Sequence, residues 1–108
     1  ADQALLDIFD AVRTTCMSFG DDVHEKMLQN YVAFKRLKNF ASVELRNSLK
    51  LVLMFVKVDP DTVDLKDGFT RDVRNIGHFG TGELEISLRS LDDVEKALPL
   101  LQKSYDVS

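Results

Sequence analysis

The stretch that decides the fold is residues 31–57, YVAFKRLKNFASVELRNSLKLVLMFVK. It holds three runs of extended character, at 31–37, 40–46 and 49–57, which are rich in β-branched and aromatic residues. Short polar segments separate the runs, as between antiparallel strands that follow one another along the chain. The stretch therefore predicts a three-stranded meander.

The hydrophobic pattern also predicts how the second and third of these strands pair. A three-residue loop at 46–48 places Leu45 opposite Leu49 and brings the alternating apolar residues of both strands onto one face. A two-residue loop would place Glu44 and Arg46 among those leucines instead. We expect the longer loop. The other face of the sheet then carries Val52, Met54 and Val56 away from the turn, so we expect about half of that face to be covered.

An amphipathic helix is predicted before the meander. Apolar residues recur at steps of three and four from Leu5 to Phe19, which is the spacing of one helix face. The single cysteine, Cys16, falls on this stripe, so we expect a buried thiol, not a reactive one. The segment 23–30 that follows is expected to form at most a helical turn.

A fourth strand and a second helix are predicted after a long connection. Residues 83–89 alternate cleanly between apolar and polar, and Ser90 is placed to cap the helix that follows. Pro99 lies inside that helix and predicts a kink or a restart. The apolar stripe of the helix is expected at Val94, Leu98, Leu101 and Tyr105.

These elements predict an α+β fold. We expect a four-stranded antiparallel sheet, made of the meander and one further strand, with the N-terminal and C-terminal helices packed on one face. The 108 residues suffice for a single domain, residues 1–108. Because the chain begins with Ala1 instead of Met, we expect a domain excised from a longer protein.

Composition restricts the class of protein. Charged residues make up 30% of the chain, and no apolar run approaches the roughly 20 residues that a bilayer requires. One cysteine excludes a disulfide framework and fits a reducing compartment, so we expect a cytoplasmic location. The net charge is -4, yet residues 31–57 carry six Lys or Arg and one Glu. This basic segment predicts either a surface for anions or a solvated face whose lysines protect the sheet edges.

The connection at 58–82 holds the candidate site residues. Residues 70–75 are expected to form a helical turn that places Arg71 and Arg74 on one face. Together with His78 and with Lys35 or Arg36 of the first strand, they would form a pocket for an anion. The alternative is that Arg71 and Asp72 take part in salt bridges that fix the loop. For His78, a structural hydrogen bond, ligand contact and acid–base chemistry all stay open.

Four of the five glycines also lie in this connection. Gly77, Gly80 and Gly82 do not make a nucleotide-binding loop, because a strand and not a helix follows them. His24 is remote from His78 in the sequence, so we expect no metal site, and no motif indicates a cofactor.

Several short motifs recur along the chain: YVAFK at 31–35, NFA at 39–41, GFTRDV at 68–73, IGHFGTG at 76–82, LEI at 84–86 and ALPLL at 97–101. Together they resemble an uncharacterised prokaryotic domain family of unknown function, sometimes labelled a predicted transport protein. The resemblance covers the chain from about Leu5 to Tyr105, and Phe79 stands where the family is associated with a tryptophan. It implies a domain that is often C-terminal in larger proteins, some of them nuclease-like, and it implies no established activity.

Our leading hypothesis is a non-enzymatic accessory module that binds an anionic partner, a nucleic acid in the first instance, beside the catalytic domain of a parent protein. Lys35, Arg71, Arg74 and His78 would make the contacts. A protein-interaction or dimerisation module is the second hypothesis, using either the half-apolar sheet face with Val52, Met54 and Val56 or an exposed edge of the sheet. A small-molecule binding domain or hydrolase centred on His78 and Asp72 is the third.

Overall fold

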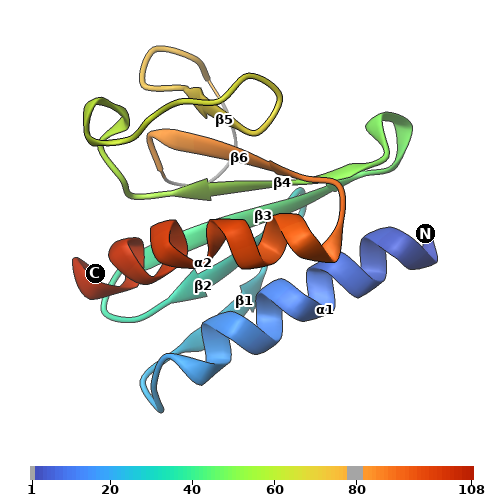
Figure 1. The fold of residues 1–108 in the computed structure, drawn as a ribbon. Coiled ribbons are helices and arrows are strands. Elements are labelled where there is room, and N and C mark those ends of the chain that lie inside the picture. The colour runs from blue at the N-terminus through green and yellow to red at the C-terminus, as the bar shows by residue number, and fades with distance from the viewer. Residues whose placement is uncertain (1, 78–81) are drawn as a thin grey trace.

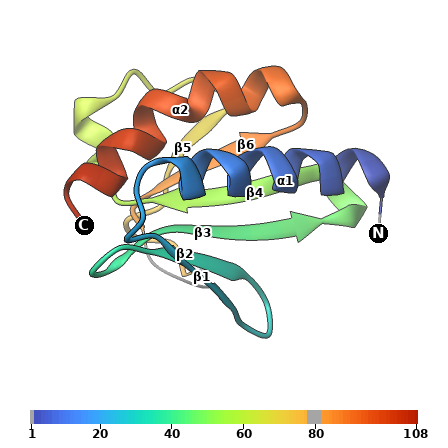
Figure 2. The ribbon, with the colours of Figure 1, turned by 90° about the horizontal axis from the view of Figure 1, so that it is seen from below.

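The computed structural model describes residues 2–77 and 82–108, which form two helices and six strands around one sheet (Figure 1). All strand pairs are antiparallel, and the order across the sheet is β1-β2-β3-β4-β6-β5. Both helices lie on one face of the sheet (Figure 2). The elements are α1 Gln3–Ser18, β1 His24–Met27, β2 Val32–Lys35, β3 Asn39–Arg46, β4 Leu51–Val56, β5 Thr70–Asp72, β6 Leu84–Leu88 and α2 Leu91–Asp106, with short 3-10 turns at Asn47–Leu49 and Pro60–Thr62.

The α+β class and the placement of both helices on one face are confirmed, but the predicted strand count is wrong. The sheet has six strands instead of four, because β1 and β5 form where helical turns were expected. Both are short edge strands. β1 is largely exposed and carries no apolar alternation, so it is held by its backbone pairing with β2. β5 is held in the same way by β6.

The predicted register between β3 and β4 is also wrong. The connection is a four-residue turn that ends at Lys50 in the left-handed conformation, with φ 57°. Leu45 therefore lies opposite Val52 and not opposite Leu49. The shift by an odd number of residues moves Val52, Met54 and Val56 under the helices, and it moves Leu51, Leu53 and Phe55 to the other face. Because every residue of β4 is apolar, the hydrophobic pattern could not decide between the two registers.

The main core lies between the helices and the sheet. Helix α1 buries Leu5, Ile8, Val12 and Cys16, so the prediction of a buried thiol is confirmed. Helix α2 runs through Pro99 as one element, so the predicted restart is wrong, and Pro99 is exposed. Leu98 is 43% exposed and does not belong to the core stripe, where Ala97 and Ser104 stand instead. No helix in the described part of the chain has the length and apolar character that a membrane span requires.

Polar contacts fix the C-terminal end of α2. The Ser104 hydroxyl is fully buried, donates to the Phe40 carbonyl and accepts from the Lys57 backbone N–H at 2.8 Å. The Tyr105 hydroxyl donates to a carboxylate oxygen of Asp22 at 2.7 Å. Helix α2 is thereby tied both to the sheet and to the connection between α1 and β1.

Candidate functional site

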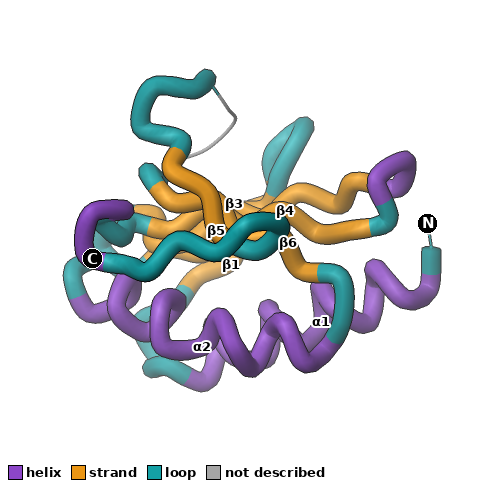
Figure 3. Tube along the Cα trace, turned by 45° about the horizontal axis from the view of Figure 1, so that its top comes forward, coloured by secondary structure: helices purple, strands orange, loops and turns teal. Residues whose placement is uncertain are grey.

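The face of the sheet opposite the helices, here called the open face, carries the candidate site. The tube view shows both helices on one side of the sheet, with the segment after β5 rising on the other (Figure 3). The open face has its own small apolar cluster, separate from the main core. Leu51, Leu53 and Phe55 of β4 form it together with Val73, whose backbone N–H donates to the Glu83 carbonyl at 3.0 Å.

Two buried carboxylates stand on either side of this apolar cluster. Glu44 of β3 lies opposite Leu53, and Glu85 of β6 lies opposite Phe55. They are only 6% and 8% exposed. A buried carboxylate needs a charged or hydrogen-bonding partner, and arginines supply one on each side. Each of the two buried carboxylates therefore holds one arginine at the surface of the open face.

The two arginines bridge from the buried carboxylates to solvent. An Arg71 terminal nitrogen lies 3.0 Å from Glu85 Oε2, and Arg46 Nε lies 3.9 Å from Glu44 Oε1. The arginine side chains are 58% and 48% exposed. A guanidinium has five N–H donors, so a single contact with a carboxylate leaves most of them for another acceptor. A cavity of about 170 Å³ lies between these groups.

Lysines extend the basic surface across the sheet. Lys26 of β1 lies opposite Ala33, and Lys35 of β2 lies opposite His24. Glu25, the residue between His24 and Lys26, reaches Arg13 of α1 and so points to the helix side. Because side chains alternate along a strand, Lys26 and Lys35 lie on the open face. Neither lysine makes an ion pair with another described residue.

The charges of the two sides are thus opposite. The strand residues of the open face comprise four exposed cations and two buried, paired carboxylates. Helices α1 and α2 on the other side carry six acidic and three basic residues. An acidic chain therefore presents one positively charged face.

The structure does not bring the predicted site residues into one pocket. Lys35 on β2 and Arg71 on β5 share the open face, but three strands lie between them, so they stand about 19 Å apart. Arg74 lies beyond the end of β5, and it shares no helical face with Arg71. His78 lies outside the described residues.

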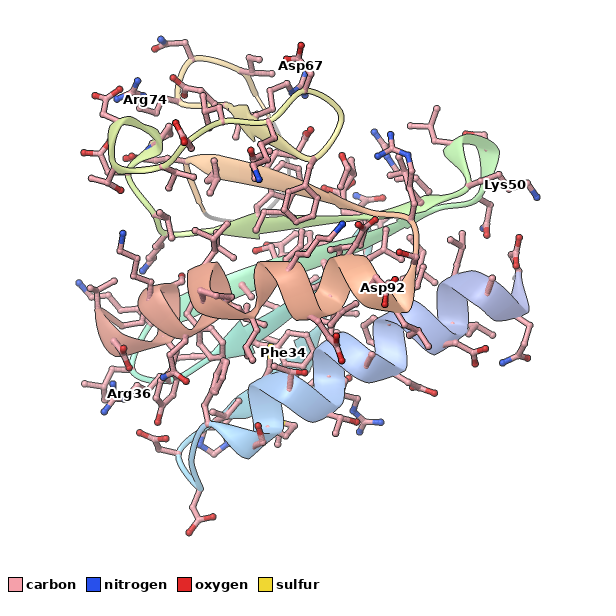
Figure 4. All side chains as sticks on the ribbon, viewed as in Figure 1. Phe34, Arg36, Lys50, Asp67, Arg74 and Asp92 are labelled. Carbon is pink, nitrogen blue, oxygen red and sulfur yellow. The ribbon has the colours of Figure 1, made fainter. Side chains whose placement is uncertain are left out.

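Arg74 is engaged by carboxylates of its own neighbourhood. Its two terminal nitrogens lie 3.0 Å from the two carboxylate oxygens of Asp61, and one of them lies 2.7 Å from Asp72 (the arginine is labelled in Figure 4). Hydrogen bonds from Arg74 hold the pKa of both aspartates below its usual value. The alternative expectation placed Asp72 in a salt bridge that fixes the loop, and its partner in the structure is Arg74. Arg74 therefore contributes to structure more than to an open anion site.

Sequence reasoning missed Lys26 and Arg46 as site residues. Arg46 was placed on the correct face of its strand by the alternation of apolar and polar residues, but no local motif marked it as a contact residue. Lys26 lay in a segment without strand signal. No group of three His, Cys, Asp or Glu side chains within residues 2–77 and 82–108 is arranged to hold a metal ion.

The fold and this surface define a small α+β domain with a basic open sheet face. The chain belongs to the family described as a domain of unknown function (DUF5655), whose model matches residues 1–108, and this confirms the resemblance found in the sequence. It is 20% identical over 98 residues to an uncharacterized protein of Haemophilus influenzae (strain ATCC 51907 / DSM 11121 / KW20 / Rd), a match that covers 91% of this chain. The chain spans about a third (32%) of the length of that relative. No solved structure matches the chain.

Proposed function

We propose that this domain is a non-enzymatic accessory module that binds an anionic partner, a nucleic acid, through the open face of its sheet. The observation that carries the proposal is the opposite charge of the two faces. Lys26, Lys35, Arg46 and Arg71 are exposed on the open face, and the only strand carboxylates among them are buried and paired. Local potential and not net charge decides whether a polyanion binds, because charges are screened over about 8 Å at physiological salt.

The arrangement favours phosphate contacts over base contacts. The cations lie on four strands, β1, β2, β3 and β5, which include both edges of the sheet, and this suits a chain of phosphates better than a single ion. Phe55, the aromatic residue of the central strand, is buried, so its ring is not available for stacking on a base. Binding through this face should therefore depend strongly on salt and weakly on nucleotide sequence.

The proposal places the domain in the cytoplasm, beside a catalytic domain of a larger protein. The relative from Haemophilus influenzae is about three times as long as the matched region, which leaves room in that protein for a further domain. The accessory module would hold the nucleic acid near that domain and would contribute no catalytic residue.

The test is the salt dependence of binding to fluorescein-labelled single-stranded DNA, duplex DNA and RNA, measured by fluorescence anisotropy between 25 and 200 mM salt. Lys26→Ala combined with Lys35→Ala should weaken binding and flatten the slope of log K against log salt by about 1.4 to 1.8. The matched control, Lys96→Ala with Lys103→Ala on α2, should leave the slope unchanged. Equal losses in both double variants, or no salt-dependent binding at all, would reject the proposal.

A protein-interaction or dimerisation module is the second candidate, favoured by one observation. The edge strand β1 pairs only with β2, and its last residue, Met27, is 76% exposed. The surface expected from the sequence, Val52, Met54 and Val56, does not serve this role, because these residues are buried under the helices. A mass that rises with concentration, and that Met27→Lys abolishes, would favour this candidate over the first.

A further inference from the structure

We propose that His24, in its protonated form, holds a phosphate group of the bound nucleic acid together with Lys26 and Lys35, so that binding takes up a proton. This inference rests on the proposed function and adds a fifth contact to the four cations of the open face. It also gives the interaction a pH dependence near neutrality. The lysines and arginines of the open face do not supply one, because such side chains ordinarily stay charged in this range.

The strand register brings His24 close to the two lysines. His24 lies directly opposite Lys35 in the antiparallel pair of β1 and β2, and directly opposite residues have their Cβ atoms about 5 Å apart. Lys26 follows two residues along β1 on the same face, at about 7 Å. Lys26 and Lys35 are diagonal neighbours, about 7 to 8 Å apart. These three exposed residues, here called the edge patch, are close enough for one phosphate group to meet all of them.

The nearby carboxylates are engaged elsewhere. Glu25, the residue after His24, points to the helix side, where its carboxylate lies 2.5 Å from Arg13 Nε. Asp22, two residues before His24, pairs with Arg36 at 2.9 Å. No residue of the edge patch takes part in an ion pair within residues 2–77 and 82–108. β1 is also the outermost strand of the sheet (Figure 2). The described charges that face the imidazole are therefore the two ammonium groups.

These ammonium groups couple the proton on His24 to the phosphate. In the free protein they oppose a third positive charge, because like charges at directly opposite strand positions repel each other. A phosphate group between them offsets that repulsion and accepts a hydrogen bond from the imidazolium. Phosphate binding and proton binding then strengthen each other by the same factor. Because histidine is the side chain whose charge ordinarily changes between pH 5 and 8, the coupling should be seen in this range.

The experiment measures binding of the chain to a rhodamine-labelled 12-nucleotide oligothymidylate by fluorescence anisotropy between pH 5.5 and 8. Thymine and the phosphodiester groups do not titrate in this range, so a proton taken up on binding goes to the protein. At constant salt, the affinity should rise by about fivefold or more from pH 7.5 to pH 5.5. The slope of log K against log salt should be steeper by about 0.7 at pH 5.5, which corresponds to one further phosphate contact on a single strand.

Two variants isolate the contribution of His24. His24→Gln should bind within twofold of the parent chain at pH 7.5 and should lose the pH dependence. His24→Lys, whose charge does not depend on pH in this range, should bind at pH 7.5 as tightly as the parent chain binds at pH 5.5. Because His24 is exposed, both variants should keep the unfolding midpoint of the parent chain. The matched control is His78→Gln, at the other of the two histidines in the chain, and it should keep the pH dependence.

The outcomes separate this inference from the proposed function. Binding whose pH dependence persists in His24→Gln, or disappears in His78→Gln instead, would overturn the inference and leave the proposed function standing. Unchanged affinity of His24→Lys at pH 7.5 would overturn it as well. Absence of binding to the parent chain at every pH would reject the proposed function and this inference together.

Discussion

Ser104→Ala tests how α2 is attached to the sheet. The backbone pairing of β3 with β4 ends at Ala41 opposite Val56, and the next two residues along the ladder are Phe40 and Lys57. The Ser104 hydroxyl stands between them, because it donates to the Phe40 carbonyl and accepts the Lys57 N–H. The hydroxyl thereby takes the place of one backbone hydrogen bond between β3 and β4, and the same two hydrogen bonds attach α2 to the sheet.

The magnitude follows from what the alanine leaves behind. Two hydrogen bonds of about 1 kcal/mol each are lost, and a carbonyl and an N–H away from bulk water lose their partner. The free energy of unfolding should therefore fall by about 2 to 4 kcal/mol, a large share of the roughly 5 to 15 kcal/mol of a typical domain. The midpoint of thermal unfolding should fall by roughly 10 to 20 °C.

Urea unfolding followed by circular dichroism measures this loss, with Ser18→Ala as the control. Ser18 also bonds a carbonyl near a helix end, but it is exposed, so its removal should cost less than about 0.5 kcal/mol. If the free energy of unfolding of Ser104→Ala falls by less than about 1 kcal/mol at an unchanged m-value, the Phe40 carbonyl and the Lys57 N–H do not need the hydroxyl. That result would refute the reasoning.

Three further predictions concern other parts of the chain. Gly20→Ala should destabilise the domain, because an added Cβ would lie 2.5 Å from the Tyr105 hydroxyl oxygen. Gly77→Ala should change the urea midpoint little, because no atom lies within 4 Å of an added Cβ there. Equal effects of the two substitutions would contradict this prediction. Arg74 lowers the pKa of its two aspartate partners, so their contribution to stability is present above their unfolded pKa near 3.8 and is lost as pH falls through the lower folded values. Arg74→Ala should accordingly reduce the fall in the free energy of unfolding between pH 4 and 2. An unchanged pH dependence in this range would contradict the prediction. Burial raises the pKa of the Cys16 thiol, so a disulfide reagent such as 5,5′-dithiobis(2-nitrobenzoate) should label it in urea but not in the native protein, and rapid native labelling would show that the site opens.

The elements that the sequence predicted are those rich in buried apolar residues. Both helices and β6 show apolar residues at regular spacing, whereas β2, β3 and β4 hold nearly continuous buried runs. β1 and β5 did not stand out because they lie at the sheet edges, where backbone pairing holds a strand whose side chains are mostly exposed or polar. The register of β4 could not be predicted because both of its faces are apolar and both become buried, one under the helices and one under Val73.

The candidate site depended on that register. Lys35 and Arg71 were identified from their charge and position, yet only the pairing of the strands places them on one face with Arg46. The role of Arg74 depended on Asp61, which is 13 residues away in sequence and comes close only because the connection folds back. Long-range pairing of this kind leaves no local signal in the sequence.

The central claim is that the open face and not the helical face meets a polyanion. An NMR titration of the ¹⁵N-labelled domain with a 12-nucleotide single strand at 50 mM salt tests it most directly. The account predicts that the largest amide shifts fall on Lys26, Lys35, Arg46 and Arg71, that they vanish at 300 mM salt, and that α1 and α2 stay unperturbed. Shifts concentrated on the helices, or none at low salt, would contradict it.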